Sequence, residues 1–337
     1  MIDELDEALH DLYPVPGEDA GALRRVRTRV LAEIEERPAD RRRRWPRLPL
    51  AVAAVLVAVA VVAMALRGSA PPVAMVEVAQ TLNTAADAQT RALDGPIPAG
   101  SYRYIATHSL HAAYNPGVAG LFGTREETWV PADPSAQWFL LRTDTGERTR
   151  LLGTDEQVKG SGLDARSSPE RLSGRCGNFY PAAGDPCAAP GNWQSPTAAF
   201  LAELPRDPRR LYDRLRTDTK GHGQDRDQEV LVYVTDALRS GLIPADLRAA
   251  LYRALTYLPP LEISERRVTL DGRAGTALGI TAAGKQQEIV IDPVTGAFIG
   301  ERKRLTEDQD GVPAGTVVGS STVRYAIVGK PWQRPAS

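Results

Sequence analysis

The hydrophobic positions near the start of the chain recur at helical spacing. Two such stripes occur, and Pro14 and Pro16 separate them. The first stripe consists of Ile2, Leu5, Leu9 and Leu12, and the second consists of Leu23, Val26, Val30 and Ile34. Spacings of three and four residues predict two short amphipathic helices. Residues 1–47 are too short to bury a core of their own. Either the two helices fold back on each other or the second stripe is a surface for a partner, and the alternative to both is a partly helical tail without a partner.

A longer apolar run follows. Residues 48–66 contain no charged and no hydrogen-bonding side chain. At 1.5 Å per residue this run gives a helix of about 28 Å, close to the roughly 30 Å hydrocarbon core of a bilayer. We therefore expect a transmembrane helix over 48–66. The alternatives are a buried helix of a soluble protein and a cleaved signal peptide, for which the preceding 47 residues and the length of the run are unusual.

The charges on either side of this run predict its orientation. Arg41 to Arg44 and Arg47 precede it, whereas Arg67 is the nearest cation after it. The positive-inside rule then puts the N-terminus in the cytoplasm and residues 67–337 outside, in a single-pass membrane protein. The chain would thus consist of a cytoplasmic helical arm (1–47), a transmembrane helix (48–66) and an extracytoplasmic domain (67–337).

The pattern changes repeatedly within 67–337. Helical spacing covers 73–93, and three short β-type runs follow at 101–107, 127–130 and 137–141. A turn is predicted at 143–146, with another strand at 148–152. Helical segments then begin at Asp207-Pro208, 229 and 244, and further strands are expected at 268–270, 275–280, 288–291, 298–302 and 317–328. This order predicts an α+β domain with a helical block and a largely antiparallel sheet.

Residues 153–197 have no clear period and are rich in Gly, Ser, Pro and Ala. They contain Cys176 and Cys187, which are the only two cysteines of the chain. Outside the cytoplasm these two are expected to form a disulfide, which would stabilise a loop-rich segment. A redox role is less favoured, because the spacing is not C-x-x-C.

Charge and motifs exclude several classes of function. The formal net charge is −1, so the chain as a whole has no electrostatic reason to bind nucleic acid. The sequence contains no G-x-S-x-G, S-x-x-K, H-E-x-x-H or G-x-G-x-x-G motif. Residues 279–285 have the Gly and Lys spacing of a phosphate-binding loop, but Gln286 replaces the magnesium-binding hydroxyl, which favours a hairpin turn. We therefore assign no catalytic, metal-binding or cofactor-binding residues.

Two further polar groups have ordinary interpretations. His108 and His111 form the one close histidine pair of the sequence. On a strand they would point to opposite faces, which opposes a shared metal, and an exposed loop is the interpretation we prefer for them. Asp225, Asp227 and Glu229 follow Gly223 and fit a hydrated linker between helices better than a carboxylate site.

Four segments resemble a family of actinobacterial single-pass membrane proteins of uncharacterised function. These segments are 127–133, 204–208, 242–252 and 292–301. Members of that family are often encoded near extracytoplasmic-function sigma factors, so the resemblance implies a link to sigma-factor regulation. No catalytic residues are established for the family, and none are transferred. The order of elements is also similar to the lipoprotein-carrier and sigma-regulator fold, a curved antiparallel sheet that clasps helices.

These observations favour a non-enzymatic, membrane-anchored protein whose outer domain binds or senses a ligand. The bilayer is its partner through 48–66, and a cytoplasmic regulatory protein is the candidate partner of 1–47. The alternatives are an anchored extracytoplasmic hydrolase without a recognisable motif and a structural protein of the envelope. An apolar pocket would favour the binding protein, whereas two convergent carboxylates, or a Ser in contact with a His, would favour the hydrolase.

Overall fold

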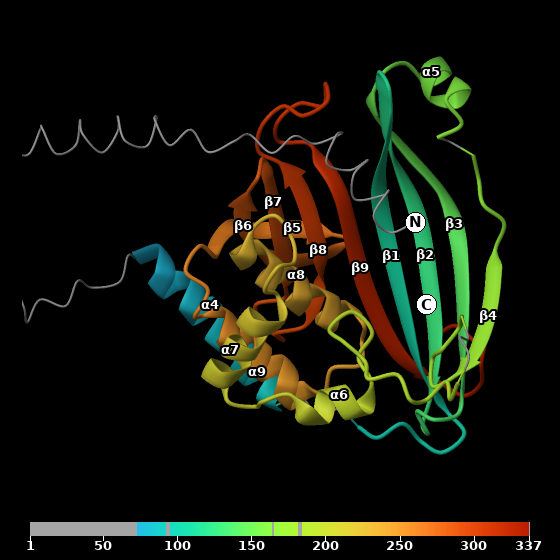
Figure 1. Cartoon of the computed structure of the whole chain (residues 1–337), viewed down its shortest axis with the longest axis vertical. Helices are drawn as coiled ribbons and strands as arrows, with labels where there is room; N and C mark the ends of the chain where they lie inside the picture. Colours follow the sequence, from blue (N-terminus) through green and yellow to red (C-terminus); the bar gives the residue numbers. More distant parts are fainter. Residues whose placement is uncertain (1–72, 92–94, 164, 181–183, 337) are drawn as a thin grey trace, which may run out of the picture. The chain divides into compact units, whose positions relative to one another are not determined.

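The computed structural model describes residues 73–91, 95–163, 165–180 and 184–336. They belong to one compact unit that begins at Ala70. Nine antiparallel strands form one sheet in the order β4-β3-β2-β1-β9-β8-β7-β6-β5 (Figure 1). The strands are β1 (Tyr102–Asn115), β2 (Val118–Pro131), β3 (Gln137–Leu152), β4 (Glu170–Arg175), β5 (Glu262–Leu270), β6 (Arg273–Ala282), β7 (Lys285–Ile291), β8 (Phe298–Leu305) and β9 (Val317–Val328). The α+β class and the antiparallel sheet are confirmed.

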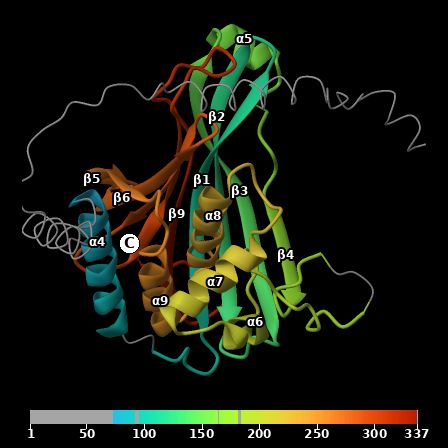
Figure 2. The same cartoon turned by 60° about the vertical axis from the view of Figure 1, so that its left-hand side comes forward.

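The helices pack together on one face of this sheet (Figures 1 and 2). They are α4 (Val73–Arg91), α6 (Ala198–Glu203), α7 (Pro208–Asp218), α8 (Arg226–Arg239) and α9 (Ala245–Leu255), while the short α5 (Asp155–Gly160) lies apart at the far end of β3. Helix α8 contacts β6, β7 and β8, and α9 packs between α4 and α7. The main core of the unit therefore lies between the helical block and the β5–β8 half of the sheet.

Local sequence explains where these helices begin and what they bury. Asp207 caps α7 by accepting a hydrogen bond from the Arg210 amide at 2.9 Å, and Pro208 occupies the first turn. Asp225 caps α8 in the same way, and Asp227 and Glu229 lie in the first turn of this helix, so the linker expected at these three acids was wrong. Leu247, Leu251 and Leu255 share one face of α9 and are fully buried. At roughly 1.5–3 kcal/mol for each buried leucine, this face binds α9 to the core.

Alternation along the strands gives the sheet two different faces. On β1, Ile105 belongs to the core beneath the helices, whereas its neighbour Tyr104 belongs to an aromatic cluster on the opposite face. We call these the helix face and the outer face. The outer face is also packed: Tyr104 lies beside Trp129 with ring centroids 5.5 Å apart. Both faces of the sheet therefore contribute to its stability.

The C-terminal tail (329–336) folds back over this aromatic cluster. Trp332 lies 5.1 Å from the ring of Trp129 and 5.4 Å from that of Phe139. The indole of Trp129 donates a hydrogen bond to the Gln333 carbonyl at 2.6 Å. Trp332 has φ of +64°, a conformation that a bulky residue adopts only when its surroundings hold it there. The tail is thus a packed part of the unit.

Two expectations were wrong in detail. The predicted turn at 143–146 is instead an irregularity inside β3, where the register to β2 shifts between Phe122 and Thr124. Residues 153–197 were expected to lack regular structure, yet they contain α5 and β4. The register shift interrupts the alternation of β3, and β4 is only six residues long, so neither segment has an alternating pattern long enough to detect in the sequence.

The predicted arm (1–47), the predicted span (48–66) and the stripe of Leu23, Val26, Val30 and Ile34 lie outside the described residues. Among the helices that are described, none combines the length and the apolar character needed to cross a membrane.

Candidate functional site

A pocket opens where the helical block meets β1 and β9, with a volume of about 240 Å³. It lies between the C-terminal end of α8, the loop to α9, the start of β8 and the two strands. Its lining consists of Gly95, Arg103, Leu238, Gly241, Ile243, Arg248, Phe298, Tyr325, Ala326 and Ile327. The charged side chains in this lining are two arginines, and the rest of the surface is mainly apolar.

Arg103 reaches the pocket from β1. It alternates with Tyr104, so it points to the helix face, where its Nη1 donates a hydrogen bond to the Gly241 carbonyl at 3.1 Å. Gly241 follows the last turn of α8 with φ of +67°, and a Cβ there would lie 3.1 Å from the Ile105 side chain. The helix end and β1 therefore meet closely at this glycine. The Arg103 guanidinium lies at the carbonyl end of α8, where a positive charge is favourable.

Arg248 forms the opposite wall, on α9. Its Nε donates to the Gln89 side chain on α4 at 2.6 Å, and its Nη1 donates to the Ile243 carbonyl at 2.6 Å. This guanidinium therefore joins two helices and the α8–α9 loop. Close to it, the hydroxyl of the fully buried Tyr252 has no hydrogen-bond partner among the described residues. Burial raises the pKa of that hydroxyl, and Tyr325 raises it further against the opposing effect of Arg248.

The mouth of the pocket carries two large side chains from β9. Tyr325 is 44% exposed and Ile327 is 48% exposed. Both alternate onto the helix face, because their partners on β1 are Ile105 and Arg103. Apolar surface left open beside a cavity is typical of places where a ligand or partner binds. The pocket thus combines a charged wall with an apolar mouth.

A second polar group lies between α8 and the sheet. Arg239 donates from Nη1 to Glu301 on β8 and from Nη2 to Asp236. Glu301 also accepts from Gln287 at 2.8 Å and from the Ser321 hydroxyl at 2.9 Å. Burial raises the pKa of Asp236, and the neighbouring Arg239 opposes this shift. Two carboxylates do converge here, but both are engaged by one arginine, so the group acts as a polar link between helix and sheet.

The histidines occupy a strand rather than the expected exposed loop. His108 and His111 both lie on β1. The sequence of this segment alternates as a strand does, and the expected loop was therefore wrong. His108 Nε2 lies 2.7 Å from a Glu147 carboxylate oxygen. Burial lowers the pKa of His111, and Arg239 and Lys303 lower it further. Because the two side chains lie on opposite faces, they cannot share a metal. The described residues contain no cluster of three or more His, Cys, Asp or Glu that could hold a metal ion.

Residues 279–285 form a β-hairpin, as expected. Strand β6 ends at Ala282 and β7 begins at Lys285, with Gly284 at φ of +73° in the turn. No helix follows this glycine, so the backbone amides and helix N-terminus of a phosphate-binding loop are not present at this position.

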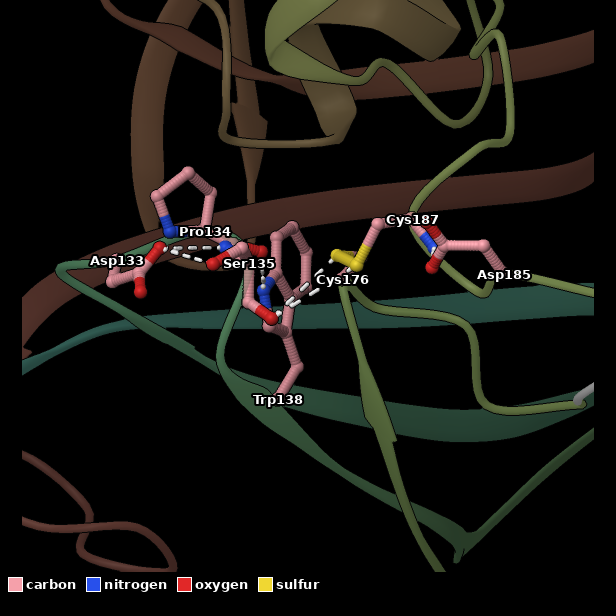
Figure 3. Close-up of a disulfide and its surroundings, with 7 residues drawn as sticks. All are labelled: Asp133, Pro134, Ser135, Trp138, Cys176, Asp185 and Cys187. Atoms are coloured by element: carbon pink, nitrogen blue, oxygen red, sulfur yellow. Dashed lines mark hydrogen bonds between the residues drawn. A yellow bond between two sulfur atoms is a disulfide. The ribbon is translucent and has the colours of Figure 1, made fainter.

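The disulfide between Cys176 and Cys187 is formed, as predicted (Figure 3). It lies beside the turn between β2 and β3, where the Ser135 carbonyl oxygen is 3.6 Å from Cys176 Sγ. Trp138 donates from its indole to the Pro134 carbonyl at 2.9 Å, which fixes the same turn. The bond therefore closes a loop in the segment after β4, and this loop lies against the β2–β3 turn.

Replacement of both cysteines by serine is expected to lower the free energy of unfolding by up to about 3 kcal/mol, because the bond restricts the unfolded chain. Urea denaturation of the oxidised protein and of the double variant measures this difference. Without reduction, the denatured wild type should not react with a thiol-alkylating reagent. Two reactive thiols per chain would show that the bond does not form in the native protein.

None of the pocket residues was singled out from the sequence. Arg103 and Tyr325 lie in strands whose alternation could be detected, but their meeting with Arg248 depends on the pairing of β1 with β9. Those strands are more than 200 residues apart along the chain. The available signal was weaker: Arg103 lies between Tyr102 and Tyr104, on the side of the strand that faces the core.

Comparison with known proteins adds little to this description. No family model and no curated protein matches the chain. One solved structure, a DUF1329 family protein from Desulfovibrio piger, is similar over 75% of this chain and 95% of its own, with 11% sequence identity and a TM-score of 0.17. A similarity this low carries no argument about fold or function.

Proposed function

We propose that this chain is a non-enzymatic, membrane-anchored binding or sensing protein whose pocket-bearing unit lies outside the cytoplasm. The observation that carries the proposal is the pocket between the helical block and β1 and β9. Its lining offers charge and apolar surface, and none of its side chains is a carboxylate, a serine or a histidine. Such a lining suits recognition of a ligand better than proton transfer or nucleophilic attack.

The disulfide supports the extracytoplasmic location. Structural disulfides persist in oxidising compartments and are rare in the cytosol. The arginine-rich segment before 48–66 supports the same orientation, with residues 1–47 in the cytoplasm. In this arrangement the arm would carry a signal to a cytoplasmic regulator, in keeping with the resemblance to proteins encoded near sigma factors. The alternative of an anchored hydrolase needs a free acid or base, and the pair Asp236 and Glu301 is already engaged by Arg239.

Substitution Ile327→Trp should close the pocket without disturbing the core, because this side chain is half exposed at the mouth. We expect the full-length wild type, purified from its native membrane, to retain a small molecule that Ile327→Trp lacks. Tyr114→Trp, at an equally exposed position at the far end of β1, is the matched control and should behave as the wild type. Mass spectrometry of the extracts measures the difference. Extracts with the same composition for all three proteins would refute the binding function.

A further inference from the structure

The charge of Arg103 suggests what the pocket binds. Its side chain donates a hydrogen bond to the Gly241 carbonyl, and no carboxylate among the described residues forms an ion pair with it. Arg302, Arg304 and Arg239, by contrast, each lie against a carboxylate. A guanidinium presents five donors in a fork that matches carboxylate and phosphate groups. The Arg103 fork therefore has unused capacity for an anion at the pocket wall.

Apolar side chains line the same pocket beside this arginine. Ile327 is the cross-strand partner of Arg103 on β9, and Leu238 and Phe298 also line the pocket, with Phe298 buried at the edge of the main core. A ligand that fills this space should have an anionic group toward Arg103 and hydrocarbon toward these side chains. The volume of about 240 Å³ is below the roughly 300–1,000 Å³ of pockets that hold drug-sized ligands, so the ligand is small.

We infer that the pocket takes a small organic anion with a short apolar chain or ring. This inference rests on the proposed binding function and specifies the ligand class of the same pocket. A cation is disfavoured because both charged lining groups are arginines. A purely polar anion is disfavoured because it would leave Phe298 and Ile327 without apolar contacts.

The test uses full-length protein in phosphatidylcholine nanodiscs and isothermal titration with hexanoate, hexylammonium and 1-hexanol. These three probes share the chain length and differ in charge. We expect hexanoate to bind with a sub-millimolar dissociation constant, 1-hexanol to bind at least tenfold more weakly, and hexylammonium to give no measurable heat. Equal affinity for hexanoate and 1-hexanol would overturn the anion preference while leaving the binding function intact.

Arg103→Gln should weaken hexanoate at least tenfold and leave the affinity for 1-hexanol unchanged, because it removes the charged fork and keeps the apolar wall. Arg103→Lys should recover part of the loss, since it restores the charge without the fork. Arg125→Gln is the matched control: it removes an arginine from the neighbouring strand β2, on the outer face. Hexanoate affinity that is the same in Arg103→Gln and in the wild type would overturn the inference. Failure of every probe to bind, together with empty extracts from the native protein, would also overturn the binding function.

Discussion

Arg302→Ala is expected to lower the free energy of unfolding by about 3 kcal/mol. Arg302 and Glu288 face each other on β8 and β7, and the Glu288 side chain is fully buried. The Arg302 Nη2 donates to Glu288 at 3.1 Å and to Glu265 at 2.8 Å. Removal of one partner from a buried ion pair typically costs about 3–5 kcal/mol, because the remaining charge stays buried. We expect a loss at the lower end of this range, because Arg304 also lies near the Glu288 carboxylate, at 4.0 Å.

Urea denaturation followed by tryptophan fluorescence measures this loss. Arg324→Ala is the matched control, because Arg324 forms an exposed ion pair with Asp271, and such pairs contribute about 0–1 kcal/mol. The double variant Glu288→Gln with Arg302→Met should regain most of the stability, since it leaves no buried charge. If Arg302→Ala and Arg324→Ala cost the same, the buried pair has no special role in the sheet.

This pair also illustrates what the sequence could predict. The pattern over 288–291 and 298–302 predicts two strands, and both lie within the longer strands β7 and β8. The alternation does not reveal that an ion-pair network covers the outer face of the β5–β8 half of the sheet. This network consists of Glu265, Glu288 and Arg302. A charged residue in an alternating strand normally lies on a face of the sheet that is exposed to solvent. Here the long charged side chains bury one another instead. Burial of these charges depends on the register that sets Glu288 opposite Arg302, and on Glu265, which reaches them from β5, two strands away from β7.

Ending the chain after Val328 is the second change with a large expected effect, a loss of about 2–4 kcal/mol. It removes Trp332 from the aromatic cluster, at about 0.5–1.5 kcal/mol beyond area burial for each aromatic pair. It also removes Arg334, whose Nε donates to Glu127 at 2.7 Å. The Glu127 side chain is fully buried, and a buried acceptor without its partner costs about 1–3 kcal/mol. Urea denaturation of the full-length chain and of the chain that ends after Val328 measures the difference between their free energies of unfolding.

The loss should depend on pH. Burial tends to raise the pKa of Glu127, but hydrogen bonds from Arg334 and Tyr104 outweigh it and hold the pKa below its usual value of 4.5. The stability from this carboxylate is therefore present above that unfolded value and is lost as the pH falls through the lower folded pKa. The gap between full-length and shortened chains should be widest near neutral pH and narrow in acid. A chain that ends after Arg334 is the control and should match the wild type; equal stability of all three chains would contradict the packed tail.

The candidate site was less predictable than the fold. The cysteines could be paired because the chain has only two, and the cap at Asp207 follows a local rule. The pocket has no such local signal. It requires Arg103 from one strand, Tyr325 from a strand near the other end of the chain, and the glycine at which α8 ends. Each of these residues is ordinary in its own segment, and only the tertiary contacts bring them together.

The most direct test of the account is the location of the pocket-bearing unit. A reporter that is active only outside the cytoplasm, fused after Ser337, measures it in intact cells, and the fusion point lies beyond the contacts of Arg334. We expect full activity of this reporter and no signal from a cytoplasm-only reporter at the same position. Activity of the cytoplasm-only reporter there would contradict an extracytoplasmic binding protein.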